Sequence, residues 1–293
     1  MRLLIVANFD KPLVQSALEE LLPWLKQRVE VTGISTADKA DLVNSAAEAI
    51  LVFGGDGTLL NIARRLEGWT IPLMGVNFGR LGFLASFTPQ QFRVHFEAFL
   101  AGKLPISTRQ QIEASVLPAG STCRFDDRPQ VAAKRRWMST ALNDVVISAG
   151  SPFRLIVLEI SADDEAGVRY SGDGVIVSTA SGSTAYNVAS GGPIITPDVA
   201  AMCITPICPH SLSFRPVVIS LRSTVLITAS RLNSGTTLIC DGQAATGLAA
   251  GERIVVRKSR HEVLLVENPD ARRWRTLAEK LNWAAEPRYN SPA

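Results

Sequence analysis

The 293-residue sequence contains only four cysteines and three histidines. None of the cysteines (Cys123, Cys203, Cys208 and Cys240) forms a CxxC pair or stands near a histidine at the spacing typical of a zinc site. This scarcity argues against a structural metal and against a disulfide framework. We therefore expect buried, reduced thiols of the kind found in cytoplasmic proteins.

Long apolar runs and a strong charge of one sign are also missing. The first apolar run ends at Asn8, far below the length of a signal peptide, and no segment approaches the ~20 apolar residues of a membrane span. Lys plus Arg number 30 against 27 for Asp plus Glu, a net charge of +3 that is too small to indicate a nucleic-acid surface. The composition predicts a cytoplasmic protein that binds neither membranes nor nucleic acid.

Residues 1–105 alternate between patterns typical of strands and of helices. Strands are expected at 3–7, 29–34, 50–53 and 71–76, and helices at 14–29, 37–47 and 87–100, with a further helix after residue 58. This alternation predicts a Rossmann-like α/β domain with a mainly parallel sheet. Ligands bind such sheets at the carboxyl ends of the strands.

From residue 106 to about 265 the pattern changes to short runs rich in β-branched residues, separated by turn residues. Such runs predict a β-rich domain, a sandwich of antiparallel sheets. A final helix is expected at about 271–283. Trp274, Leu277 and Leu281 form its apolar stripe, which predicts that it packs back onto the first domain.

The segment Gly54-Gly55-Asp56-Gly57-Thr58 lies between a predicted buried strand and a predicted helix. Its glycines let backbone N–H groups approach a ligand closely, and a helix N-terminus favours a phosphate. A carboxylate would repel that phosphate, so Asp56 needs a reason to be there. Abstraction of a proton from a hydroxyl that attacks a phosphoryl group provides one. The alternative is a tight turn in which Asp56 caps the helix.

Two further segments carry groups suited to a nucleotide. Residues 172–187 are dense in glycine and hydroxyls, and Asp173 in this run could accept hydrogen bonds from a ribose diol. Asn143 has an amide suited to a base edge, and Asp144 a carboxylate suited to ribose hydroxyls. The alternatives are a Ser/Thr-rich loop with capping roles and a simple turn before a strand. Asp241-Gly242, taken alone, is a commonplace turn.

Together these segments resemble the NAD kinase family, whose members transfer a phosphoryl group from ATP to the 2′-hydroxyl of NAD. Segments 54–58, 77–84, 143–144, 172–186, 209–216 and 241–243 occur in the order found in that family. The first of them is shared with lipid kinases and phosphofructokinases, whereas 172–186 is much more specific. The resemblance implies two domains with NAD bound in the crevice between them.

The same resemblance implies roles for individual residues. Asp56 would be the catalytic residue that orients or deprotonates the 2′-hydroxyl. The triphosphate would face Gly54, Gly55, Gly57 and Thr58. The adenine–ribose part of NAD would be held by Asn143 and Asp144, and the nicotinamide ribose by Asp173 with Arg154 nearby. The remaining residues implied to line or border the nucleotide pocket are Phe83, Ser181, Thr184, Ala185, Tyr186, Asn187, Val188, Ala189 and Gln243.

The resemblance also implies partners and shows two departures. Mg²⁺ is expected to arrive bound to ATP, because no metal cage is evident. In related members a neighbouring subunit completes the NAD site, so a homodimer or homotetramer is expected. Asp144 stands where the family usually has Glu, which shortens its reach by one methylene. Ala180 stands where Pro is common, which loosens the loop and leaves the chemistry unchanged.

Two other functions compete with this interpretation. A lipid or sugar kinase of the same superfamily would have an apolar cavity or a membrane-binding surface and would ignore NAD. The lack of an amphipathic basic helix argues against the lipid version. A non-catalytic sensor would bind NAD or NADP without turnover, and Asp56 argues against it because a carboxylate does not help a protein that only binds phosphate.

Overall fold

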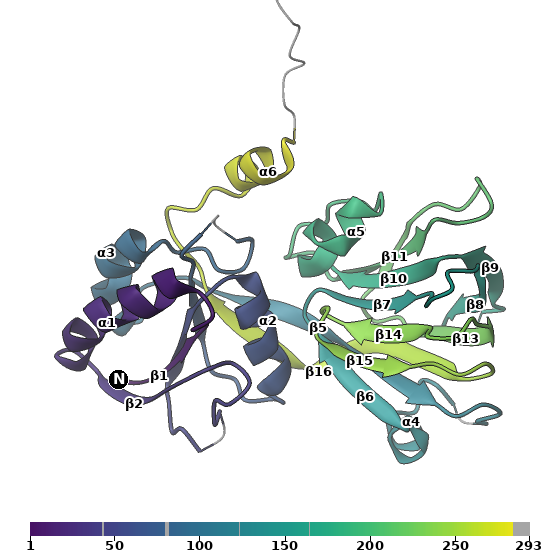
Figure 1. Cartoon of the computed structure of the whole chain (residues 1–293), viewed down its shortest axis with the longest axis horizontal. Helices are drawn as coiled ribbons and strands as arrows, with labels where there is room; N and C mark the ends of the chain where they lie inside the picture. The colour runs from purple at the N-terminus through teal and green to yellow at the C-terminus, as the bar shows by residue number, and fades with distance from the viewer. Residues whose placement is uncertain (43, 80–81, 123, 164, 284–293) are drawn as a thin grey trace, which may run out of the picture.

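The computed structural model of the chain describes residues 1–42, 44–79, 82–122, 124–163 and 165–283. Two halves lie side by side (Figure 1), and residues of both line a cavity between them, called the crevice below. Arg80 and Leu81 of the 77–84 segment, and Cys123, lie outside the described residues.

The first half is an α/β layer structure, as predicted. Its strands β2 (Glu30–Ser35), β1 (Arg2–Ala7), β3 (Ala49–Phe53) and β4 (Leu73–Val76) are parallel and adjacent in that order. Alternate side chains of each strand point to opposite faces. Helices α1 (Pro12–Lys26) and α3 (Pro89–Leu100) therefore pack on one face and α2 (Asp56–Arg65) on the other.

The helix predicted at 37–47 is wrong. The described residues of this segment form turns instead. The Arg65 guanidinium, from α2, donates hydrogen bonds to the carbonyl oxygens of Ala37 and Ala40. These carbonyls therefore find their partners on another element, and no helical ladder is needed to satisfy them.

The second half is a sandwich of two sheets. One layer contains β5 (Ile106–Leu117), β6 (Trp137–Ala141), β16 (Arg253–Val266), β13 (Val225–Arg231), β8 (Ile156–Ala162) and β9 (Val168–Gly172). The other has the order β12 (Val217–Ser220), β11 (Ala201–Ile207), β10 (Gly174–Thr179), β7 (Asp144–Ser148), β14 (Thr237–Cys240) and β15 (Ala244–Gly247). Apolar residues from both layers form the core between them. A short helix, α4 (Arg128–Lys134), lies against β5.

One sheet runs through both halves, which the sequence did not predict. Leu265 near the end of β16 pairs with Leu73 of β4, while the rest of β16 pairs with β5 and β13. The long strands β5 and β16 thus belong to both halves. Hydrogen-bonded strands resist shear, so this shared sheet fixes how the two walls of the crevice face each other.

The cysteine prediction is partly wrong. Cys203 and Cys240 are buried free thiols, as expected, but Cys208 is exposed. Cys208 directly follows β11 and has a φ of 43°, a turn conformation at the end of the sheet. Turn residues at a sheet end face solvent, so the apolar character of a thiol does not bury this one.

The C-terminal helix α6 (Arg273–Leu281) lies above the two halves (Figure 1), and its residues Arg273, Thr276 and Leu277 line the cavity between them. Leu277 is buried, whereas Trp274 is 65% exposed and contacts the Trp283 ring at 5.4 Å between centroids. The predicted apolar stripe is therefore wrong at Trp274. The inward face of α6 carries Arg273, Leu277 and Lys280, which share a face because of their i, i+4, i+7 spacing.

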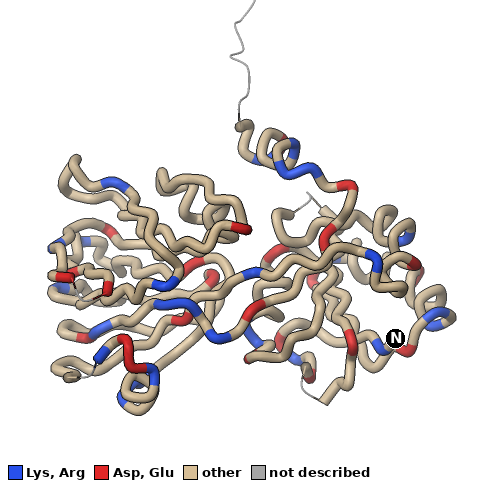
Figure 2. Tube along the Cα trace, turned by 180° about the vertical axis from the view of Figure 1, so that it is seen from behind, with Lys and Arg blue, Asp and Glu red and all other residues tan. Residues whose placement is uncertain are grey.

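Charges of both signs are interspersed over the two halves (Figure 2), in keeping with the small net charge of +3. Among the described helices, none combines the length and the apolar character needed to cross a membrane.

Candidate active site

The Asp56 side chain is held by the loop that follows β4. Its Oδ2 accepts a hydrogen bond from the Phe83 N–H (2.9 Å), and its Oδ1 accepts from the N–H groups of Leu84 (3.3 Å) and Ala85 (2.9 Å). The N-cap of α2 is Gly55 and no side chain caps the helix, so Asp56 does not serve as the cap of its own helix. A carboxylate has about four lone-pair sites. Three are used, which leaves one on Oδ2 for a ligand hydroxyl.

Glycines create the space for this arrangement. A Cβ on Gly82 would lie 1.7 Å from Asp56 Oδ1, and a Cβ on Gly54 would lie 2.5 Å from Thr58 Oγ1. A side chain at either glycine would therefore displace its neighbour, Asp56 or Thr58. Gly55 and Gly57 belong to the same turn between β3 and α2, so the predicted phosphate loop lies at the carboxyl end of a parallel strand, as expected.

Sequence reasoning missed a lysine beside this loop. Lys11 Nζ lies 3.7 Å from the position that a Gly55 Cβ would occupy. Lys11 is exposed and follows β1, the strand next to β3 in the sheet. The sequence did contain a signal for this position, because Lys11 follows the strand next to β3 and parallel strands end at the same edge of a sheet.

Asp241 organises the second predicted segment. Its carboxylate accepts hydrogen bonds from the N–H groups of Leu142 (2.7 Å), Asn143 (2.7 Å) and Asp144 (3.1 Å). The Asn143 carbonyl in turn accepts from the Thr179 N–H at 2.8 Å. The turn before β7 is thus tied to the ends of β14 and β10. Sequence reasoning treated Asp241 as part of a commonplace turn and missed this role.

Asp144 and Asp241 form a coupled buried pair. Burial raises the pKa of Asp144 to about 7, the neighbouring Asp241 charge raises it further, and the Tyr186 N–H opposes the rise. Burial also raises the pKa of Asp241, to about 6, against the lowering by its three backbone N–H donors. Because Asp241 has more donors, it ionises first, and Asp144 holds its proton to near neutral pH.

We predict a pH-dependent gain in stability for Asp144→Asn. The folded-state pKa of about 7 lies above the ordinary 3.8, so the folded chain keeps a proton that the unfolded chain loses. The contribution of Asp144 to the stability of the parent therefore falls as pH rises from about 4 to about 7. Above pH 7 this contribution stays constant. The variant lacks this loss and should gain about 4 kcal/mol on the parent over that range. Urea unfolding at about pH 4.5 and 8 measures the difference.

The exposed Asp10→Asn variant provides the control for this measurement, because it removes a carboxylate without changing a buried pair. The stability difference from the parent should change more between the two pH values for Asp144→Asn than for this control. An equal change for the two variants would contradict the raised pKa.

The 172–187 segment forms the other wall of the crevice. Strand β10 leads into a 3₁₀ helix, η1 (Ser181–Thr184), and the short helix α5 (Tyr186–Ala189). Ser181 and Thr184 line the crevice, Tyr186 is 46% exposed, and Ala189 is exposed on α5. Ala185 and Val188 are half-buried beside them.

Asn187 does not have a ligand-binding position. It is fully buried, and its Nδ2 donates to the carbonyls of Ser183 (3.1 Å) and Pro193 (2.9 Å). Its Oδ1 accepts from Thr205 Oγ1 at 2.5 Å. The expectation that Asn187 contacts the nucleotide is therefore corrected: its amide is used to hold α5 against the second sheet.

Gln243 joins the two halves. Its Nε2 donates to the Gly57 carbonyl at 2.7 Å, from the turn after β14 to the start of α2. The side chain therefore holds the glycine-rich loop in place relative to the Asn143 turn.

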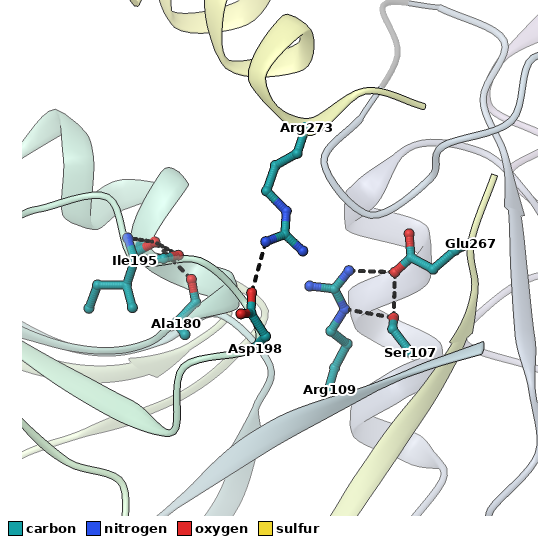
Figure 3. A network of polar contacts seen from close by, with 8 residues as sticks. Ser107, Arg109, Ala180, Ile195, Asp198, Glu267 and Arg273 are labelled. Carbon is teal, nitrogen blue, oxygen red and sulfur yellow. Dashed lines mark hydrogen bonds and ion pairs between the residues drawn. The ribbon is translucent and has the colours of Figure 1, made fainter. Parts of the chain in front are cut away.

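A cavity of about 570 Å³ lies between the halves, under α6. Phe83, Ser181 and Thr184 line it, and the Asp56 carboxylate lies directly behind Gly82 in its wall. Figure 3 shows two ion pairs at its edge: Arg109 with Glu267 (2.6 Å) and Arg273 of α6 with Asp198 (2.8 Å).

Asp173 and Arg154 are not brought to this cavity. Asp173 precedes β10 and bonds through its backbone to Ala149 and Ile207. The six residues of β10 separate it from η1, a distance of about 20 Å at ~3.3 Å per residue. Both side chains are exposed at the far end of the strand.

Among the described residues, no three His, Cys, Asp or Glu side chains gather at one point where they could hold a metal ion. Asp198 and Glu267 line the cavity but are paired with arginines, and the oxygens of Asp56, behind Gly82, are largely used by backbone donors.

Comparison with known proteins places this geometry in a family. Two sequence profiles match, the ATP-NAD kinase N-terminal domain over residues 34–104 and the ATP-NAD kinase C-terminal domain over residues 142–268. The chain belongs to the NAD kinase family. The resemblance drawn from the sequence is confirmed, and the chain is a kinase, an enzyme that transfers phosphoryl groups.

Two relatives in this family match over nearly their whole length. An NAD kinase of Prosthecochloris aestuarii is 37% identical, over 99% of this chain and 100% of that protein. An NAD kinase of Desulforamulus reducens is 37% identical, over 94% of this chain and 96% of that protein. A solved yeast NADH kinase in complex with NADH has the same fold, with a TM-score of 0.84 and 24% identity over 99% of this chain and 90% of that one.

Proposed function

We propose that this protein transfers the γ-phosphoryl group of ATP to the 2′-hydroxyl of the adenosine ribose of NAD, giving NADP. The observation that carries the proposal is the Asp56 carboxylate, fixed by three backbone N–H groups in the wall of the crevice cavity beside a glycine-rich loop. The carboxylate keeps one lone pair for a hydroxyl, and the loop offers amides to a phosphate chain.

NAD would place its adenosine end in the crevice cavity. A volume of about 570 Å³ suits a nucleoside and its first phosphates. The Phe83 ring offers a surface for the base, and the Ser181 and Thr184 hydroxyls offer hydrogen bonds. Asp144, protonated to near neutral pH, could donate as well as accept, which suits a ribose or a base edge. In this arrangement residues 1–105 and 106–265 act as two domains around the cavity.

ATP would approach from the glycine-rich loop, as its Mg²⁺ complex. Lys11 beside Gly55 supplies a cation for the phosphate chain, and the turn at Gly54, Gly55 and Gly57 supplies close backbone contact. Mg²⁺ keeps several waters and is usually bound through substrate phosphates, so it enters as part of the substrate. Bound there, it neutralises charge on the β- and γ-phosphates.

The chemistry needs little from the protein beyond this geometry. A ribose hydroxyl is a poor nucleophile at neutral pH, and a positioned base is worth typically ~10²–10⁴-fold. Fixing the Asp56 orientation in advance avoids its reorganisation during transfer. The remaining acceleration comes from charge neutralisation around the transferred phosphoryl group.

The test is a product assay with NAD, ATP and Mg²⁺, in which NADP is detected by an NADP-specific dehydrogenase. NAD that lacks the 2′-hydroxyl is the matched control and should yield no product. ATP turnover with no NADP formed, or phosphorylation of a lipid or a free sugar in preference to NAD, would contradict the proposal. NADP formed from polyphosphate but not from ATP would overturn the choice of donor alone.

A second copy of the chain would complete the nicotinamide end of the site. Asp173 lies about 20 Å from η1 in the same chain, and among the described residues neither Asp173 nor Arg154 lines the crevice cavity, which leaves both to act on a neighbour's NAD. Apolar side chains are exposed beside Arg154: Phe153 (81%) and Leu155 (39%). Exposed apolar residues around a functional group support an interface, here a homodimer or homotetramer.

Complementation tests this arrangement. Asp173→Ala and Asp56→Asn should each be nearly inactive alone. In a mixed dimer, one of the two sites would combine the intact Asp56 of the Asp173→Ala chain with the intact Asp173 of the Asp56→Asn chain. The other site would contain both substitutions and stay inactive. If subunits exchange freely, activity should return to about a quarter of the parent value. No recovery after verified subunit exchange would show that each site is built from one chain.

A further inference from the structure

Lys280 is a cation of the active-site region that none of the roles above uses. Its Nζ lies 5.0 Å from the centroid of the Phe83 ring, and Phe83 is the residue whose N–H binds Asp56. Lys280 is half-buried. Partial burial lowers its pKa, and the nearby Asp56 charge opposes that change, which places the ammonium in the field of the carboxylate.

Lys280 has no anion of its own among the described residues: no ion pair or hydrogen bond there involves its amine. Arg273 on the same face of α6 is paired with Asp198, and Arg275 on the outer face is paired with Glu279. A half-buried ammonium with only a ring face and the more distant Asp56 charge beside it is incompletely compensated for its lost hydration. An anionic ligand would supply that compensation.

Helix α6 holds this cation over the crevice. Arg273 ties its first turn to Asp198 in the second half, and the buried Leu277 lines the cavity one turn later. Lys280 follows at i+3 from Leu277 on the same face. The ammonium therefore comes from α6, whereas Lys11 lies beside Gly55 in the glycine-rich loop at the start of α2.

Charge balance indicates what the cation is for. The transferred phosphoryl group must come within reach of a hydroxyl bound to Asp56, and a carboxylate repels it. The described ion pairs give Asp56 no Arg or Lys partner within 4.0 Å, only backbone donors. A cation beside that point offsets the repulsion during transfer, when negative charge is spread over the phosphoryl oxygens.

We propose that Lys280 is a further residue of the reaction, whose ammonium contacts the phosphoryl group as it passes from the donor to the hydroxyl held by Asp56. This inference rests on the proposed function, since it assumes a phosphoryl group at that point. Helix α6 acts in it as the carrier of the cation.

Kinetics of Lys280→Met and Lys280→Arg give the first test, with Arg275→Met as the matched control on the outer face of the same helix. Lys280→Met should lower kcat by about 10²-fold, the usual loss for one charge-stabilising donor, and leave the KM for NAD nearly unchanged. Lys280→Arg should recover most of that loss, and Arg275→Met should resemble the parent. An unchanged kcat for Lys280→Met, or the same loss in Arg275→Met, would overturn the inference.

Chemical labelling of the parent enzyme gives a second test that does not depend on NADP formation. Acetylation of Lys280 by a limiting amount of an amine-reactive ester is followed by peptide mass spectrometry. MgATP together with NAD should slow labelling of Lys280 several-fold, and NAD alone should not. Unchanged labelling with calorimetrically confirmed MgATP binding would overturn the Lys280 role while leaving the proposed function intact. Protection by MgATP in an enzyme that makes no NADP would instead fault the proposed acceptor.

Discussion

Asp56→Asn is expected to lower kcat for NADP formation by at least ~10²-fold while NAD still binds. The amide cannot accept the proton of the 2′-hydroxyl. In addition, only one of its two ends can accept hydrogen bonds, whereas the Phe83, Leu84 and Ala85 N–H groups point at both carboxylate oxygens. The variant therefore loses the general base and also some of the hydrogen bonds that hold the side chain at position 56.

Calorimetry with NAD and initial-rate kinetics separate these effects. If the Kd for NAD stays within about threefold of the parent value while kcat falls, Asp56 acts in the chemical step. Turnover near the parent value would refute the role assigned to Asp56. Equal losses of binding and turnover would show that the substitution disturbs the loop at 83–85 rather than the proton transfer.

Gly82→Ala is expected to reduce kcat by a similar factor, of about 10² or more, although residue 82 carries no chemical group. A Cβ there would lie 1.7 Å from Asp56 Oδ1, so the carboxylate must leave its place. Displacement by about 1 Å is enough to cost on the order of 10²-fold in a positioned catalytic group. The stability loss should be modest, because Asp56 can turn toward the cavity.

Gly79→Ala is the matched control in the same loop. A Cβ at that position would meet its nearest neighbour, Asn77 Oδ1, at 3.8 Å, an ordinary contact. Its kinetics should stay close to those of the parent. If Gly79→Ala and Gly82→Ala lost activity equally, the effect would come from stiffening of the loop, and the account of the Asp56 support would be wrong.

The predictable parts of this protein are those fixed by local pattern. Residues 50–53 form a buried strand because four apolar residues are followed by glycines, and the helix after them starts where the loop ends. The helix expected at 87–100 begins at Pro89, where Thr88 and Gln91 form a capping box. Local pattern also found Asp56, because a carboxylate in a phosphate loop is chemically unusual.

The parts that could not be predicted depend on contacts between distant residues. Asp241 binds amides 97 to 99 positions earlier in the chain, and nothing in an Asp-Gly pair reveals that. Gln243 meets Gly57 across 186 positions. Helix α6 meets the rest of the chain through the Arg273–Asp198 pair and the buried Leu277, partners that a helical repeat does not specify. The periodicity of the sequence predicts the helices and strands. How these elements pack together depends on side-chain contacts between residues far apart in the sequence.

The most direct test of the central claim is ³¹P NMR of the products formed by the parent enzyme from NAD and MgATP. The account predicts ADP together with a new phosphate monoester resonance that is coupled to the 2′-proton of the adenosine ribose. A monoester on any other hydroxyl, or ADP with inorganic phosphate and unchanged NAD, would contradict it.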